Sequence, residues 1–484
     1  MENGIEKQEY EIEKIENGIE KKENGIEKIE DGIEKIKDLS IKVKITQKTH
    51  IQPKKKLGRR ECQLVTFDLP YLGFFYNQKL MIYKENGSDF EDIVKKLKDG
   101  LSVVLEEFYQ LAGRLGRDDD GVFKVMYDDD MDGAEVLDAI VDDNDDNIMV
   151  SVDDLVSKED ITLMKDLVPY NGVLNLEGLQ CPLLAIQLTK LRDGLAIGCA
   201  FNHAVLDGSA TWHFMSSWAE ICNGAQSIST LPFLDRTKAR STRVSVNLPH
   251  APPQLDLTSA PNLREKLFRF SETAIENIKA AHNTTPPSNG TTAATNPPYS
   301  TFQSLSSHLW RSVTAARGLK PEDPTVFTIF ADCRKRVDPP MPDSYFGNLI
   351  QAIFAGTSAG ILLGNSPEFT AGMIKAAIGA HDAAAIEKRN KDWEDKPIIF
   401  QYKDAGMNCV AVGSSPRFKV YDVDFGFGTP ERVRSGSNNR FDGMIYLYPE
   451  KGGGKGIDVE ISLEVKAMDN LETDKMFLMN GEVV

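Results

Sequence analysis

Apolar residues recur at seven-residue intervals in the first part of the chain. Between residues 1 and 38 an Asn-Gly-Ile-Glu-Lys unit is repeated with small changes. Its isoleucines fall on two heptad positions, with Ile5, Ile12, Ile19, Ile26 and Ile33 on one and Ile15, Ile29 and Ile36 on the other. This spacing is typical of a coiled coil, but each repeated glycine costs a helix about 1 kcal/mol. We expect residues 1–38 to form a charged tail that is disordered or weakly helical.

From residue 41 onward the pattern changes to that of a mixed α/β chain. Alternation at 41–46 predicts an edge strand, and the apolar run 64–69, ended by Pro70, predicts a second strand. Apolar positions at helical spacing predict an amphipathic helix over about 90–112. Further strands are expected at 183–191, 195–201, 325–331, 417–425 and 457–465, and a further helix at 301–317.

The strands 183–191 and 195–201 are joined at Asp193-Gly194, which is a strong hairpin turn. The second strand leads directly to His203, and Ser209 is placed to cap the helix that follows. Helices alternate with strands in both halves of the chain, which predicts two similar α/β domains. Ligand sites tend to lie at the seam between such domains.

Composition narrows the class of protein. The chain has 484 residues, too many for one ordinary core, and a net charge of −17, which argues against a nucleic-acid partner. Its six cysteines include no C-x-x-C pair, so neither a zinc site nor a disulfide framework is expected. The sequence contains no apolar run of 18 residues and no apolar signal-peptide core. We therefore expect a cytoplasmic protein without a membrane span or a bound metal.

The segment Asn202-His203-Ala204-Val205-Leu206-Asp207-Gly208 carries the strongest candidate chemistry. His203 follows a predicted strand, where its imidazole can face a cleft and act as a general base near neutral pH. The alternative is a structural histidine held by backbone hydrogen bonds. Asp207 could orient His203, as in a catalytic triad, or pair with an arginine and hold the shape of the loop. Gly208 permits a tight turn, which favours the structural role of Asp207.

Three weaker motifs suggest other classes. The run 356–360 matches the Gly-x-Ser-x-Gly elbow of a serine hydrolase at Ser358, but His381 alone follows it, with little room for the intervening sheet. The acidic region 128–139 resembles half of a calcium loop, yet its twelfth position is alanine instead of the bidentate glutamate. The Asp-Phe-Gly at 424–426 lacks the other kinase motifs.

The ordered combination of motifs resembles the plant BAHD acyltransferases. The family's His-x-x-x-Asp-Gly motif corresponds to residues 203–208, and its Asp-Phe-Gly-Trp-Gly motif to residues 424–428. Two further blocks are similar to shared ones: Leu305 to Arg311, and Asp332 to Arg336 followed by Pro339-Pro340 and Tyr345 to Asn348. The resemblance extends from about residue 41 to the end of the chain.

The resemblance implies two chloramphenicol-acetyltransferase-like domains, residues 41–244 and 263–484, joined by a crossover linker at 245–262, with a channel at their interface. It implies acyl-CoA as co-substrate, no bound cofactor, and a small-molecule alcohol or amine as acceptor. His203 would remove the proton of the acceptor without a covalent acyl-enzyme. We expect a monomer. A non-catalytic binding protein of the same fold is the alternative, and the intact His203 and Gly208 speak against it.

Supporting roles follow from the same resemblance. Asp207 is expected to pair with an arginine of the 332–336 block, and Arg334 is our choice. Asp424, Gly426 and Gly428 are expected to shape the C-terminal domain without touching the acceptor. Phe427 stands where the family has tryptophan. It can fill the same space, but it has no N–H to donate. The residue that donates a hydrogen bond to the oxyanion is therefore not assigned.

Two segments resemble one branch of the family more closely. Residues 62–70 and 412–418 are similar to the "defective in cuticular ridges" proteins. That similarity implies a role in cutin formation and favours a fatty or hydroxy-fatty substrate.

Overall fold

The computed structural model describes residues 42–84, 87, 89–141, 150–157, 162–246, 262–283, 297–399 and 408–479. The repetitive tail expected at 1–38 lies outside the described residues, as does most of the crossover expected at 245–262.

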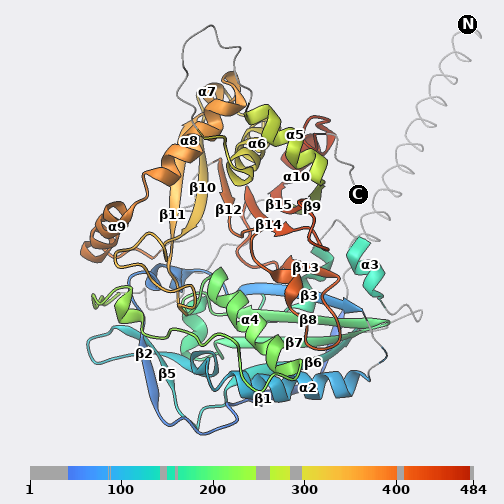
Figure 1. Cartoon of the computed structure of the whole chain (residues 1–484), viewed down its shortest axis with the longest axis vertical. Helices are drawn as coiled ribbons and strands as arrows, with labels where there is room; N and C mark the ends of the chain where they lie inside the picture. Colours follow the sequence, from blue (N-terminus) through green and yellow to red (C-terminus); the bar gives the residue numbers. More distant parts are fainter. Residues whose placement is uncertain are drawn as a thin grey trace, which may run out of the picture. The chain divides into compact units, whose positions relative to one another are not determined.

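The N-terminal half is built on a six-stranded sheet with the order β1-β6-β7-β8-β3-β13 (Figure 1). Five of its strands are β1 (Val43–Ile51), β3 (Asn77–Lys84), β6 (Ala134–Val141), β7 (Leu184–Leu191) and β8 (Gly194–Phe201). A small sheet contains β2 (Arg60–Gln63), β4 (Arg114–Arg117) and β5 (Phe123–Tyr127). The edge position of β1 and the β7–β8 hairpin confirm two of the predictions.

Two long helices accompany this sheet, α2 (Phe90–Val104) and α4 (Gly208–Cys222). They pack on each other, and the Trp218 indole of α4 donates a hydrogen bond of 3.0 Å to the Leu97 carbonyl of α2. The predicted helix over 90–112 is too long, because α2 ends at Val104 and a turn leads to the short 3-10 helix η2 (Tyr109–Ala112).

The C-terminal half has its own six-stranded sheet, in the order β11-β10-β12-β14-β15-β9 (Figure 1). The strands are β9 (Leu263–Phe270), β10 (Pro324–Asp332), β11 (Ile350–Ser358), β12 (Cys409–Val412), β14 (Met444–Pro449) and β15 (Ile457–Glu464). The central helix α6 (Thr301–Ala316) packs its buried Leu309 and Trp310 into a core with sheet residues such as Phe327 and Val459. The predictions for α6, β10 and β15 are therefore confirmed.

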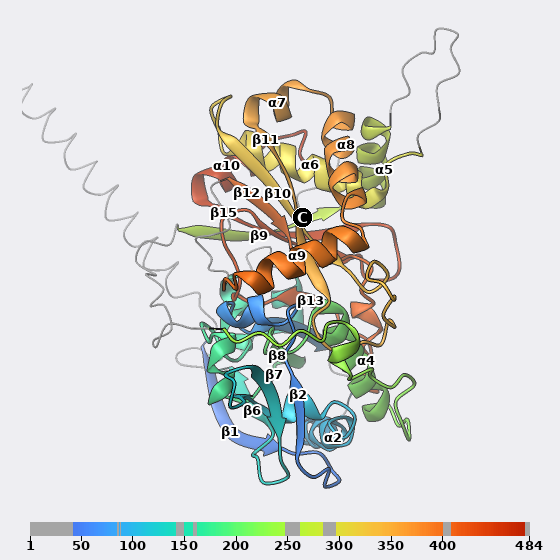
Figure 2. The ribbon, with the colours of Figure 1, turned by 90° about the vertical axis from the view of Figure 1, so that its left-hand side faces the viewer.

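Further helices surround α6 and the edge of this sheet. They are α5 (Glu272–His282), α7 (Ala359–Gly364), α8 (Pro367–Gly379), α9 (Ala383–Asp395) and α10 (Val465–Thr473). The N-terminal half contains one more short helix, α3 (Val152–Ser157). Helix α9 runs across the level at which the two halves meet (Figure 2). Its Glu394 accepts hydrogen bonds from Thr66 and Arg240, which belong to the N-terminal half.

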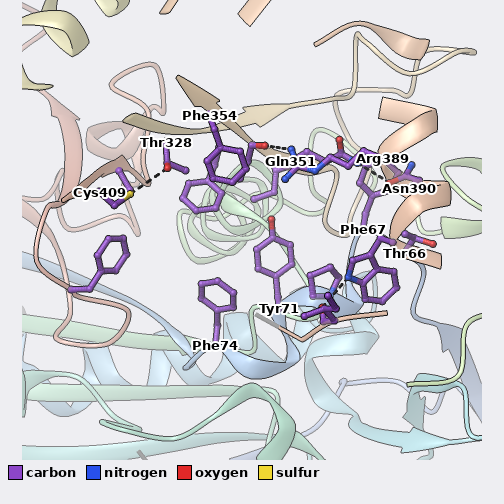
Figure 3. A pocket seen from close by; sticks show the side chains of 18 residues that line it. Thr66, Phe67, Tyr71, Phe74, Thr328, Gln351, Phe354, Arg389, Asn390 and Cys409 are labelled. Atoms are coloured by element: carbon purple, nitrogen blue, oxygen red, sulfur yellow. Dashed lines mark hydrogen bonds between the residues drawn. The ribbon is translucent and has the colours of Figure 1, made fainter. Parts of the chain in front are cut away.

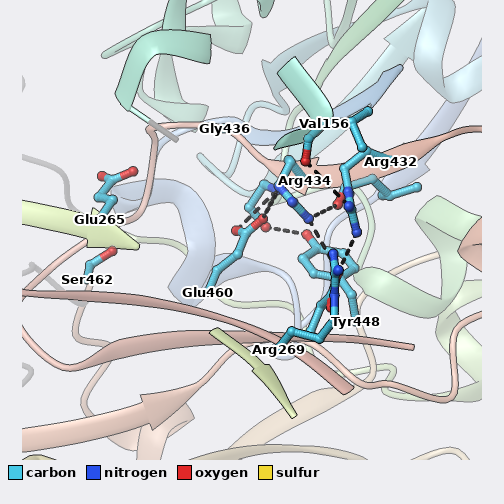
Figure 4. A network of polar contacts seen from close by, with 12 residues as sticks. Val156, Glu265, Arg269, Arg432, Arg434, Gly436, Tyr448, Glu460 and Ser462 are labelled. Carbon is cyan, nitrogen blue, oxygen red and sulfur yellow. Dashed lines mark hydrogen bonds and ion pairs between the residues drawn. The ribbon is translucent and has the colours of Figure 1, made fainter. Parts of the chain in front are cut away.

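One strand of the C-terminal half completes the N-terminal sheet. β13 (Arg432–Ser435) pairs antiparallel with β3, so the chain returns from the C-terminal half to the edge of the other sheet. Buried ion pairs link β13 and the segment after it to β15: Arg432 pairs with Asp458 at 3.0 Å, and Arg440 pairs with Glu460 at 2.8 Å. Figure 4 shows Arg432 and Glu460 within this network. Because removing one partner would leave a buried charge uncompensated, this network holds β13 and β15 together.

The strand expected at 64–69 is absent, and the prediction was wrong. β2 ends at Gln63, and residues 64–68 turn into the 3-10 helix η1 (Leu69–Gly73). The Asp68 carboxylate explains the turn, since it accepts a hydrogen bond from the Val65 N–H at 2.9 Å and pairs with the buried Arg236 at 2.9 Å. A side chain that accepts a hydrogen bond from a nearby backbone N–H in this way competes with strand pairing.

The prediction of a strand at 417–425 was also wrong. This segment forms turns and the short 3-10 helix η7 (Val420–Asp422). Its apolar residues Val420, Val423 and Phe425 are buried because they pack into the core of the N-terminal half, which accounts for the misleading pattern.

Candidate functional site

His203 lies in the turn between β8 and α4, and its backbone is held from two sides. Its N–H donates to the Asn175 side-chain oxygen at 2.8 Å, and its carbonyl accepts from the Asn348 amide at 2.8 Å. The half-buried imidazole stacks on the Tyr71 ring, with centroids 4.6 Å apart and planes 11° from parallel. The ring therefore has a fixed place and plane.

The surroundings of His203 favour its neutral form. Burial lowers the pKa of His203 below its ordinary value of 6.5, and the cation of the buried Lys79 acts in the same direction, while Asp207 opposes both. A neutral imidazole can accept a proton, which is what a general base near neutral pH requires.

Asp207 is fully buried, and its carboxylate accepts four hydrogen bonds, none of them from His203. Its Oδ1 accepts from the Ala210 N–H at 3.0 Å, which makes Asp207 the N-cap of α4; the prediction that Ser209 caps this helix was wrong. The remaining bonds come from Arg334 Nη1 and Nη2, at 2.9 and 3.0 Å, and from the Leu349 N–H at 3.0 Å. The predicted ion pair with Arg334 is thus present.

The pair also sets the charge of Arg334. Burial disfavours the guanidinium, but the Asp207 carboxylate more than offsets it, so the pKa of Arg334 is raised. The arrangement ties the turn after β8 to the segment after β10, because Arg334 comes from the C-terminal half.

A second buried pair, Asp68 with Arg236, supports the same turn and was not predicted. Asp68 Oδ1 accepts from both the backbone and the side-chain amide of Asn348, which in turn bonds the His203 carbonyl. Arg236 donates to the Val205 carbonyl at 2.6 Å. Asp68 lies in the segment that resembles the branch and Asn348 in a block that resembles the family, but no pattern in the sequence indicates that the two residues meet.

The loop Asp424–Gly428 packs on the N-terminal half instead of shaping the C-terminal domain as expected. Phe425 meets Trp218 at a centroid distance of 4.7 Å, and Phe427 meets Tyr83 at 5.1 Å. The Asp424 carboxylate accepts hydrogen bonds from the N–H groups of Gly426 and Gly428 and so closes the turn.

Two cavities have lining residues next to the His203 turn. The first, of 560 Å³, which we call the aromatic cavity, is mostly apolar and is lined in part by the rings of Phe67, Tyr71, Phe74, Phe330, Phe354 and Trp393 (Figure 3). The second, of 530 Å³, is more polar and includes Gly208, Ser209, Arg336, Ser414, Arg417 and Phe418. The two cavities share Phe330 and Ile350. His203 lines neither, but Tyr71, on which it stacks, lines the first, and Gly208 lines the second.

Ser358 has a structural place in the fold. It is the N-cap of α7, and its hydroxyl accepts from the Ile361 N–H at 3.4 Å. His381 instead contacts the Cys333 sulfur, at 3.7 Å. The Gly-x-Ser-x-Gly match is thus accounted for by a strand-to-helix turn.

All six cysteines are free thiols. Within the described ranges, no three His, Cys, Asp or Glu side chains converge as a metal site would require. Across the same part of the chain, the helices are too short or too polar to cross a membrane.

Two sheet-rich α/β halves, with a strand-end His-x-x-x-Asp-Gly segment where they meet, define a class of acyltransferase. The profile of the Transferase family matches residues 41–478. The chain belongs to this family, the BAHD acyltransferases.

Individual relatives agree with this assignment. Over 464 residues the chain is 58% identical to "BAHD acyltransferase DCR" of Arabidopsis thaliana, covering 91% of this chain and 93% of that protein. It is 29% identical to "Hydroxycinnamoyltransferase 2" of Oryza sativa subsp. japonica, covering 86% and 94%. The resemblance to the family and to its branch is confirmed.

Solved structures confirm the fold class. F. graminearum TRI101, complexed with coenzyme A and deoxynivalenol, superposes with a TM-score of 0.70 at 20% identity, covering 87% of this chain and 98% of that one. Vinorine synthase gives 0.69 at 18% identity, covering 90% and 98%.

Proposed function

We propose that this acyltransferase moves an acyl group from an acyl-CoA thioester to a hydroxyl or amine of a small acceptor, with His203 as the general base. The observation that supports the proposal is the neutral imidazole of His203, which stacks on Tyr71 of the aromatic cavity and belongs to the same turn as Gly208 of the polar cavity. The solved relative with coenzyme A in place supports a thioester as the donor.

Nδ1 of His203 is buried, and we assign the proton transfer to Nε2. Nε2 takes the proton of the acceptor hydroxyl as the oxygen attacks the thioester carbonyl. The tetrahedral intermediate collapses to the ester and expels the CoA thiolate, which takes the proton from His203. No covalent acyl-enzyme forms, and no bound cofactor is needed.

Asp207 and Arg334 act as positioning residues in this scheme, because their ion pair anchors the turn that carries His203. Asp424, Gly426, Phe427 and Gly428 support the core beneath α4. Phe427 cannot donate a hydrogen bond, so another group must stabilise the oxyanion.

We assign the aromatic cavity to the acceptor and the polar cavity to the CoA side. Apolar walls suit a hydrocarbon chain, whereas Arg336, Arg417 and several serines suit a charged, polar donor. The 58% identity to the DCR protein, and the branch's implied role in cutin formation, support a fatty or hydroxy-fatty substrate.

The test is a turnover assay on the purified protein. Acetyl-CoA, p-coumaroyl-CoA and palmitoyl-CoA are each mixed with a panel of alcohols, free thiol is followed, and products are identified by mass spectrometry. We expect one CoA thiol for each ester formed and no acyl adduct in the intact-protein mass. Binding of CoA without thiol release would favour a non-catalytic protein, and a stable acyl adduct would contradict the direct transfer.

A further inference from the structure

We propose that Arg389 binds a carboxylate of the acceptor, so that the site selects alcohols that also carry an acid group. The inference rests on the proposed function, since it takes the aromatic cavity to be the acceptor site.

Arg389 is the single charged side chain among the described residues that line the aromatic cavity. The other lining residues are apolar or neutral, and Figure 3 shows Arg389 and Gln351 above Tyr71 and Phe74. A cation in such a wall loses hydration and therefore needs compensation from a partner.

The protein supplies Arg389 with little compensation. Its Nη1 donates to the Ala352 carbonyl, and its guanidinium lies 5.3 Å from the centre of the Phe354 ring. In the part of the chain that the structure describes, no carboxylate lies within ion-pair distance of it. Burial lowers the pKa of Arg389, whereas the pKa of Arg334, which has Asp207, is raised.

The acidic side chains nearest along α9 are already occupied. Glu387 and Glu394 both pair with Arg240, and Asp392 pairs with Lys388. Of the residues one helical turn from Arg389, Trp393 lines the cavity and Ile386 is buried in a core cluster with Phe67, and both are apolar. The helix therefore presents a cation to the cavity and keeps its carboxylates elsewhere.

A carboxylate complements Arg389 in charge and in shape. A guanidinium presents a planar fork that matches the two oxygens of a carboxylate. Tyr71 lines the same cavity and stacks on His203. An acceptor can thus place its acid at Arg389 and its hydroxyl toward His203, with the apolar body between them against the aromatic wall.

The experiment compares 10-hydroxydecanoic acid with its methyl ester as acceptors. We expect wild-type kcat/KM to favour the acid by about 10- to 100-fold, the range of a hydrogen-bonded charge pair, mainly through KM. Arg389→Met should remove this preference by weakening transfer to the acid while changing transfer to the ester by less than about threefold. Arg389→Lys should restore part of the preference, because it keeps the charge and loses the fork.

Lys391→Met is the matched control, since Lys391 is an exposed cation on the same helix and should leave the preference unchanged. Calorimetry gives the affinity of each variant for the acid and for the ester, and so measures the contribution of Arg389 to binding independently of turnover. Equal affinity of the wild type for both compounds, or an equal loss for both in Arg389→Met, would overturn the inference while the acyl transfer stands. Selective binding of the acid without thiol release would uphold the Arg389 site and contradict the proposed function instead.

Discussion

Replacing Asp207 with asparagine should destabilise the fold strongly. Asparagine can keep the cap of α4, since it is a good N-cap residue. However, its amide nitrogen would replace one of two carboxylate oxygens, each of which accepts two hydrogen bonds. In either orientation two donors then face an NH₂ group, and the buried Arg334 loses its main counter-charge.

The expected cost is about 3–5 kcal/mol, the range for breaking one side of a buried ion pair. This is a large share of the roughly 5–15 kcal/mol that stabilises a typical domain. Asp332→Asn is the matched control, because Asp332 also contacts Arg334, at 3.2 Å, but its side chain is 52% exposed. A solvent-exposed contact of this kind contributes about 1 kcal/mol or less.

Urea unfolding followed by circular dichroism, with thiol release measured on the same samples, would test this. We expect a clearly lower midpoint for Asp207→Asn, an almost unchanged one for Asp332→Asn, and activity that follows the folded fraction. Adding Arg334→Met to Asp207→Asn should recover part of the loss, since it removes the unpaired cation. An Asp207→Asn protein that is as stable as wild type refutes the structural role, and one that is stable but inactive assigns Asp207 to the chemistry.

Further predictions concern pH, the C-terminal loop and the ring stack. Because burial lowers the pKa of His203, kcat/KM should fall on the acid side with a midpoint below 6.5, and a midpoint above 6.5 would contradict the neutral base. Gly426 and Gly428 both have positive φ, +88° and +105°, but a Cβ on Gly426 would also displace the end of the Lys96 side chain and lie 3.0 Å from Asn223 Oδ1, whereas one on Gly428 meets nothing within 4 Å. Gly428→Ala should therefore cost about 1–2 kcal/mol and Gly426→Ala more; equal urea midpoints would count against this packing. Tyr71→Leu should lower kcat/KM by about 2- to 10-fold through loss of stacking, and Tyr71→Phe by less, so the reverse order would show that stacking is unimportant.

Local patterns predicted part of the regular structure. The alternation at β1, the Asp193-Gly194 turn between β7 and β8, and the helical spacing of α6 each reflect contacts within a short stretch of chain. The apolar pattern at 417–425 predicted a strand wrongly, because these residues are buried in the core of the other half. The Asp424 carboxylate also accepts a hydrogen bond from the Gly426 N–H and closes a turn there.

The candidate site was predictable only in part, since its geometry depends on distant segments. His203, Asp207 and Arg334 were found because they lie in motifs that resemble a family. The Asp68–Arg236 pair and the single cation of the aromatic cavity carry no local signal. Asp68 and Arg236 lie far apart in the sequence, and Arg389 lines the aromatic cavity only because β10, β11 and α9 lie against the N-terminal half.

The rate of acyl transfer by His203→Ala tests the central claim most directly. The variant should match the wild type in its urea midpoint and in its affinity for CoA, because the backbone bonds to Asn175 and Asn348 do not involve the imidazole. Its kcat should fall by about 10²- to 10⁴-fold, the usual contribution of a general base. A folded His203→Ala protein that transfers acyl groups at more than about one tenth of the wild-type rate would contradict the account.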